Sequence, residues 1–171
     1  MRALPVLLAA TLALTVAACE RGATPDKVGQ AAAFKHDLPE DVSGYYIPTT
    51  AVQVGDWRLH HLFLGQVPDF MAWRDGQRTA GFAPIMMEFE AGDKTRRTRL
   101  IPTAYDVTED RVRFEATSRE LGAVTFEARL DQDALAKARR NLGDQGVVLK
   151  GTLKVGDRTF DGVSMRWWAG D

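Results

Sequence analysis

The chain of 171 residues contains three histidines and one cysteine, the side chains that most often hold transition metals or act as bases and nucleophiles. His60 and His61 are neighbours in a stretch whose alternating polarity predicts a β-strand, and His36 is distant from them. Successive side chains of a regular strand point to opposite faces, so these two histidines are not expected to share a metal ion, and we predict no metal site. His61 falls on the same strand face as Trp57 and Phe63, which favours a hydrogen-bonded histidine in the core or at the edge over a general base.

The sequence lacks the short motifs of several common enzyme classes. It contains no Gly-x-Ser-x-Gly, no phosphate-binding loop and no His-Glu-x-x-His. The acidic pair Glu109 and Asp110 falls at a predicted turn, and the pair Asp131 and Asp133 falls at a predicted helix start. Acids are expected at both places for structural reasons. We therefore predict a protein that is not an enzyme and uses no cofactor, with an unrecognised hydrolase as a further alternative.

Basic and aromatic residues supply the candidate contacts with a partner. The densest basic run, residues 94–99, is explained by a solvated loop and a charged edge strand, and contact with anionic lipid head groups or polyanions is the alternative. Trp167 and Trp168 end the last predicted strand, so one ring should enter the core while the other lies on the outer face. That outer ring either belongs to a small apolar cluster under a neighbouring segment or contacts a protein or glycan partner. The predicted contact residues are Trp168, Tyr45, Tyr46, Arg96, Arg97 and Arg99.

The N-terminal segment has the pattern of a secretory signal. Arg2 supplies a positive charge, residues 4–18 are almost wholly apolar, and the small residues Val-Ala-Ala precede Cys19. The apolar run is shorter than the ~20 residues that a membrane-spanning helix needs. The sequence Val-Ala-Ala-Cys at residues 16–19 closely resembles the lipobox of bacterial lipoproteins. The alternative is a buried apolar cysteine in an ordinary helix, but the segment shows no amphipathic stripe.

This resemblance, which covers residues 1–20, implies how the protein is anchored. In lipoproteins the cysteine thiol is joined to diacylglycerol, the preceding peptide is removed and the new amino group is usually acylated, so Cys19 would carry three acyl chains. Two chains already give stable anchoring. By analogy with enterobacterial lipoprotein sorting, Glu20 in place of Asp after the cysteine favours the outer membrane. We therefore expect a protein held on the outer membrane by its lipid, with its folded domain facing the periplasm.

Composition narrows the class of protein further. The whole chain has a net charge of −1, and removal of residues 1–18 would take away one arginine and no acid, leaving about −2. This near-neutral balance argues against a nucleic-acid binder. With its single cysteine lipidated, the mature chain can form no internal disulfide, so packing must stabilise it. The predicted organisation is a signal peptide over 1–18, a lipidated cysteine and flexible tether over 19–41, and one β-rich globular domain over 42–171.

From Tyr45 onward a period of two dominates the sequence and predicts half-buried antiparallel strands. Val-Gly-Asp at residues 54–56 and again at 155–157 suits tight hairpin turns. Two short helices are expected, over 68–75 and 131–142, each followed by a glycine. The predicted fold class is mainly β, a single antiparallel barrel or sandwich of about eight strands with two short helices. The clearest predicted strands lie within 57–64, 84–90, 112–117, 124–130, 147–155 and 163–168.

Two functions agree with this outline. The leading hypothesis is a non-catalytic outer-membrane lipoprotein whose β domain binds another protein, because the chain has an anchor, a tether and a disulfide-free domain without a catalytic constellation. The alternative is a carrier or sensor of a small apolar or lipid ligand inside a β-barrel. Large side chains on inward strand faces, among them Phe89, Phe114 and Phe126, favour a filled interior instead. Phe114 and Phe126 are also expected to be cross-strand neighbours on two successive strands.

Overall fold

The computed structural model describes residues 33–170, which contain two helices and one mixed β-sheet. The helices are α2 (Val67–Arg74) and α3 (Gln132–Arg140). The strands are β1 (Phe34–Asp37), β2 (Gly44–Pro48), β3 (Gln53–Val54), β4 (Trp57–Leu64), β5 (Ile85–Ala91), β6 (Arg97–Leu100), β7 (Ala104–Thr108), β8 (Arg111–Ser118), β9 (Gly122–Leu130), β10 (Val147–Val155) and β11 (Arg158–Trp168).

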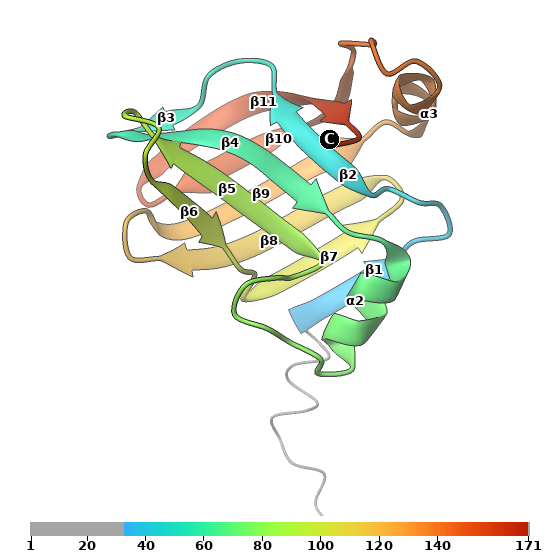
Figure 1. Ribbon diagram of the computed structural model, residues 1–171, viewed down its shortest axis with the longest axis horizontal. Coiled ribbons are helices and arrows are strands. Elements are labelled where there is room, and N and C mark those ends of the chain that lie inside the picture. The colour runs from blue at the N-terminus through green and yellow to red at the C-terminus, as the bar shows by residue number, and fades with distance from the viewer. Residues whose placement is uncertain (1–32, 171) are drawn as a thin grey trace, which may run out of the picture.

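The sheet curls into an open half-barrel (Figure 1). Its strands follow the order β1-β7-β8-β9-β10-β11-β2-β4-β5-β6, and β3 pairs with β4 beside this path. Neighbouring strands are antiparallel except β1 and β7, which run parallel. The end strands β1 and β6 are not hydrogen-bonded to each other, so the sheet has two edges.

The prediction of a mainly β fold with two short helices is confirmed, but the prediction of a single antiparallel barrel or sandwich of about eight strands is wrong. The sheet is mixed and open, and ten strands lie along its main path. The parallel strand β1 is one reason for the difference. A parallel pair needs a long crossover rather than a hairpin, so the pairing of β1 with β7 leaves no local turn signal in the sequence.

Strand β1 lies within the segment expected to be a flexible tether, residues 19–41. Phe34 is paired with Tyr105 of β7 and is only 6% exposed. The centroid of its ring lies 5.2 Å from that of Tyr105 and 6.2 Å from that of Trp73 on α2. The sheet therefore begins at Phe34, upstream of the predicted start of the domain. The predicted signal peptide and Cys19 lie outside the described residues.

Side chains on the concave side of the half-barrel form one continuous apolar core. Phe114 of β8 is paired with Phe126 of β9, as predicted, and both are fully buried. Phe126 is also paired with Leu153 of β10. Phe89 of β5 belongs to the same core and is fully buried. These large side chains fill the concave side, which supports the interpretation of a packed interior.

A β-bulge interrupts the alternation of β4. Leu59 is paired with Phe89 of β5, but the next paired residues are His61 and Glu88, so β4 has one extra residue, His60, at this point. After the bulge Leu62 and Leu64 are fully buried, whereas His61 and Phe63 are only partly buried and line a hollow on the outer face. The sequence prediction that placed His61 and Phe63 on the same face as Trp57 is therefore wrong, because the extra residue reverses the alternation.

The two helices pack at different parts of the sheet (Figure 1). Helix α2 lies beside β1, and α3 lies beside β10 and β11. Asp69 accepts a hydrogen bond from the backbone N–H of Gln66 at 2.8 Å at the start of α2. Asp131 accepts one from the backbone N–H of Ala134 at 2.9 Å at the start of α3. Strands β4, β5 and β6 stand in front of the half-barrel in Figure 1, with neither helix over their outer faces.

Candidate functional site

The outer faces of β4, β5 and β6 carry a cluster of opposite charges. Glu88 and Glu90 on β5 are only 4% and 6% exposed. Arg97 donates to Glu88 at 3.1 Å and to Glu90 at 3.2 Å. Arg99 donates to the second oxygen of Glu88 at 3.2 Å, and Arg58 donates to the second oxygen of Glu90 at 3.0 Å. Buried carboxylates need such partners, and the hydrogen bond from Arg58 holds the pKa of Glu90 below its ordinary value against the effect of burial.

Beside this charged cluster, the bulge in β4 brings two imidazole rings together. The Nδ1 atoms of His60 and His61 are 2.7 Å apart, a hydrogen-bond distance. The prediction that the two side chains point to opposite faces is therefore wrong, because it assumed a regular strand. Burial lowers the pKa of His61 to about 4, although the nearby Glu88 carboxylate acts in the opposite direction. His61 is consequently neutral at pH 7.

Aromatic side chains form a wall next to the histidines. The ring centroid of Tyr45 lies 5.1 Å from that of His61, 5.3 Å from that of Phe63 and 5.5 Å from that of Trp168. Phe82 extends the wall, with its ring centroid 6.0 Å from that of Phe63, and is 41% exposed. Rings at these distances stabilise one another beyond their buried area. The wall is therefore an ordered surface built by residues from β2, β4, β11 and the segment before β5.

One open hollow, with a volume of about 780 Å³, lies between the histidines, the aromatic wall and part of the charged cluster. This outer-face hollow is lined by Tyr45, His60, His61, Phe63, Phe82, Met86, Glu88, Arg97, Arg99, Trp168, Ala169 and Gly170. It combines rigid apolar walls with guanidinium and carboxylate groups. Such a surface suits a ligand or peptide segment that has both an apolar and a charged part.

Four of the six predicted contact residues line this hollow: Tyr45, Arg97, Arg99 and Trp168. Their sequence positions are far apart, and the pairing of β2 with β11 and of β5 with β6 brings them together. Trp167, on the other face of β11, packs against the core. The expectation that the two tryptophans divide between the core and the outer face is thus met.

The other two predicted contact residues lie elsewhere. Tyr46 is fully buried, and its hydroxyl donates a hydrogen bond to the backbone oxygen of Val42 at 2.6 Å. Strand alternation explains this position, because Tyr46 must face away from Tyr45. Arg96 precedes β6, where it pairs with Asp56 at 3.0 Å and lies 5.3 Å from the ring centroid of Trp57. Neither residue contributes to the outer-face hollow.

The sequence contained a signal for part of the charged cluster. Glu88 and Glu90 alternate on one predicted strand, and Arg97 and Arg99 alternate on the following segment. Antiparallel pairing of two such strands places opposite charges side by side, and the observed partners are Glu88 with Arg99 and Glu90 with Arg97. No comparable signal indicated the bulge at His60, because an extra residue in one strand depends on its partner strand.

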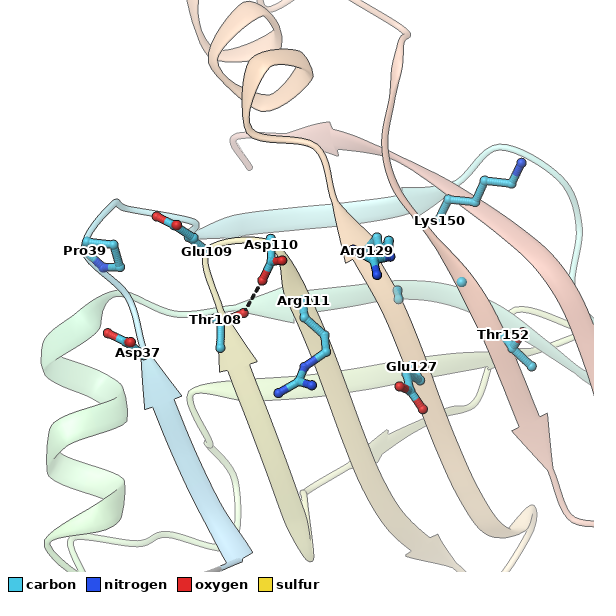
Figure 2. Close-up of a pocket in the computed structure, with 12 residues that line it drawn as sticks. Asp37, Pro39, Thr108, Glu109, Asp110, Arg111, Glu127, Arg129, Lys150 and Thr152 are labelled. Carbon is cyan, nitrogen blue, oxygen red and sulfur yellow. Dashed lines mark hydrogen bonds between the residues drawn. The ribbon is translucent and has the colours of Figure 1, made fainter.

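A second hollow, of about 740 Å³, lies over the outer faces of β7, β8, β9 and β10 (Figure 2). Figure 2 shows charged side chains of both signs spread along it, among them Glu127, Arg129 and Lys150. Thr108 donates a hydrogen bond to Asp110 at 2.7 Å, and this bond lowers the pKa of Asp110. None of the residues that line this hollow is aromatic. It therefore lacks the apolar anchors that distinguish the outer-face hollow.

Comparisons of the chain with protein-family models, curated proteins and solved structures gave no significant match. Within residues 33–170, no helix combines the length and the apolar character needed to span a membrane.

Proposed function

We propose that the protein is a non-catalytic lipoprotein of the bacterial outer membrane that binds a partner protein through the outer-face hollow. The observation that carries the proposal is the convergence of Tyr45, Trp168, Arg97 and Arg99 on one surface. Tyrosine, tryptophan and arginine are the residues that contribute most binding energy in protein interfaces. Here they come from three strands of a rigid sheet, so the surface is already formed before a partner arrives.

The charges of the hollow indicate what the partner presents. Two arginines, Arg97 and Arg99, line the hollow together with one acid, Glu88. The neighbouring Glu90 is already paired with Arg58 and Arg97. The side chains of Arg97 and Arg99 are 53% and 52% exposed, so their remaining N–H groups can reach a ligand. A partner segment with a carboxylate next to an aromatic or aliphatic side chain would satisfy both the arginines and the aromatic wall.

The proposed location rests on the sequence of residues 1–20 alone. A lipid on Cys19 would hold the sheet near the membrane surface, where its partner is expected to be another component of the cell envelope. The outer-face hollow would then serve as the contact site of an anchored module.

Photocrosslinking in living cells tests this function. A photoreactive amino acid replaces Phe82, at the rim of the outer-face hollow, and in a matched control it replaces Lys150, in the second hollow. We expect the first position to give a discrete crosslinked product that mass spectrometry identifies as an envelope protein, and the control to give none. The product should disappear when Trp168→Ala is added. Equal capture at both positions, or capture at neither, would contradict the proposal.

A carrier of a small apolar ligand is the alternative, and one observation favours it. The volume of the hollow falls within the ~300–1,000 Å³ typical of small-molecule sites, and half of the residues that line it are apolar. The fully buried Phe89, Phe114 and Phe126 place large side chains where a ligand inside the sheet would have to lie. A carrier would therefore have to use the outer face. Saturable binding of an apolar fluorescent probe that Trp168→Ala removes, together with absence of the crosslinked product, would favour this alternative.

A further inference from the structure

Three side chains that can ligate a metal converge at the bulge of β4. Each of His60, His61 and Glu88 offers one ligand atom, a ring nitrogen or a carboxylate oxygen. These three atoms lie within 4.8 Å of one another. The histidines are half-buried and Glu88 is buried, so small rotations rather than large movements are open to these side chains. A bulge that re-aims a side chain is a feature often found beside functional sites. Here the bulge is what places both imidazoles on the same side of the strand.

The distances fit a single metal ion. Zinc binds imidazole nitrogen at ~2.0–2.1 Å and carboxylate oxygen at ~2.0–2.2 Å, so tetrahedral ligands lie ~3.4 Å apart. The Nδ1 atoms of His60 and His61 are 2.7 Å apart, and the separations within the group reach at most 4.8 Å. Small rotations of the two rings would bring the three ligand atoms to the required spacing.

We propose that His60, His61 and Glu88 bind one divalent transition-metal ion of the zinc and copper class. Two imidazole nitrogens favour these ions over Mg²⁺ and Ca²⁺, which prefer oxygen ligands. The three side chains also line the outer-face hollow, so the remaining coordination positions face solvent. This inference goes beyond the proposed binding of a partner, and neither proposal depends on the other.

The arginines around Glu88 are compatible with this site. Arg97 and Arg99 each donate to a different oxygen of the Glu88 carboxylate. A carboxylate has about four acceptor positions, so each oxygen keeps one for a metal. Carboxylates that bind metals are themselves usually held by hydrogen bonds, which fix their orientation. The positive charge of the two guanidinium groups opposes a cation, however, so the affinity should be lower than that of a structural zinc site.

A hydrogen bond between two Nδ1 atoms requires one ring to carry its proton on Nδ1 and the other on Nε2. When a metal binds to both Nδ1 atoms, that one proton moves through solvent to Nε2 of the same ring. Both rings then stay neutral, and binding needs no oxidant, reductant or other reactant.

Titration calorimetry tests the proposal on the full chain in detergent, carrying Cys19→Ser so that no thiol competes. We expect one Zn²⁺ to bind per chain and Mg²⁺ not to bind. His60→Ala and His61→Ala should each weaken binding by at least ~10-fold, the loss that even an outer-shell change commonly causes. His36→Leu is the matched control, since it removes the third histidine of the chain, and it should leave the affinity unchanged. Thermal melting without metal identifies any variant that fails to fold.

Electron paramagnetic resonance with Cu²⁺ provides a second measurement that needs no variant to fold. The spectrum of the chain with both histidines in place should show coupling to two imidazole nitrogens. The proposal is overturned if Zn²⁺ does not bind at millimolar concentration, if Mg²⁺ binds equally well, or if the double change of His60 and His61 to alanine leaves the affinity intact.

Discussion

Arg97 is the residue on which the charged cluster depends most. It bridges the two buried carboxylates, donating to Glu88 at 3.1 Å and to Glu90 at 3.2 Å. A carboxylate removed from water is strongly destabilising unless a positive partner compensates it. Because the guanidinium group is about half exposed, water screens part of this interaction. The contribution of Arg97 to the free energy of unfolding should therefore lie between that of an exposed ion pair and that of a buried ion pair.

Replacement of Arg97 by methionine should therefore reduce the free energy of unfolding by ~1–2 kcal/mol. The matched control is Arg113→Met, because Arg113 pairs with Glu115 at 2.9 Å on the exposed surface. The control should change stability by less than ~1 kcal/mol. Urea unfolding of both variants measures the difference. Equal losses would show that burial of Glu88 and Glu90 does not need Arg97.

His36 allows a test of how protonation affects the packing of β1. Its Nδ1 atom is buried and has no hydrogen-bond partner among residues 33–170. Burial, with a further contribution from the charge of Arg74, lowers the pKa of His36 below 6.5, its ordinary value. As the pH falls below 6.5, the unfolded chain gains a proton at this residue before the folded chain does. Protonation of His36 in the unfolded chain therefore lowers the free energy of unfolding at acid pH. Well above pH 6.5 the residue is neutral in both states and has no such effect.

We expect His36→Leu to remove this part of the acid sensitivity. The difference in free energy of unfolding between His36→Leu and the wild type should grow in favour of the variant as the pH falls from 7.5 to 5, and should be constant above pH 7.5. Denaturant unfolding at a series of pH values measures the difference. A difference that does not change with pH would mean that His36 titrates alike in the folded and unfolded chain.

At the scale of the elements, the pairing of β8, β9 and β10 stabilises the centre of the sheet. Phe126 is the middle residue of this region, paired with Phe114 on one side and with Leu153 on the other. All three side chains are fully buried. Aromatic pairs across strands add to the stability that burial alone provides. The outer-face hollow lies on different strands, so changes in this region should affect stability without altering the hollow.

Phe126→Ala should reduce the free energy of unfolding by ~3–5 kcal/mol, the usual loss when a packed aromatic site is emptied. That is a large share of the ~5–15 kcal/mol expected for a whole domain. Denaturant unfolding, with and without an apolar fluorescent probe, measures stability and binding together. A loss below ~1 kcal/mol accompanied by altered probe binding would favour a ligand cavity in place of the filled core.

The whole molecule is an open half-barrel with its two edges at β1 and β6. Edge strands expose unpaired backbone groups that can associate with other chains. β6 is only four residues long, and Arg97 and Arg99 project from it. The prediction of a charged edge strand for the basic run is confirmed for these residues. The short length and the charges limit association through this edge.

Membrane attachment is tested by Cys19→Ser. The chain has no other cysteine to accept a lipid, so the variant should leave the membrane fraction or accumulate as an uncut precursor. Cell fractionation and mass measurement of the protein distinguish these outcomes. Lys35→Ser is a suitable control, since Lys35 is exposed on β1 and its replacement should leave processing and attachment unchanged. If Cys19→Ser is cut and membrane-bound like the wild type, the lipoprotein proposal is wrong.

The sequence by itself determined the mainly β class, the inward faces of β8 and β9 and the division of Trp167 and Trp168 between core and surface. These features depend on the alternation of apolar and polar residues along each strand, which is the same in any arrangement of the strands. Only the tertiary structure decided the parallel pairing of β1, the open form of the sheet and the bulge at His60. Each of these depends on contacts between strands far apart in the chain, and a register shift of one residue reverses which side chains are buried. The outer-face hollow is therefore a product of strand pairing rather than of any continuous sequence motif.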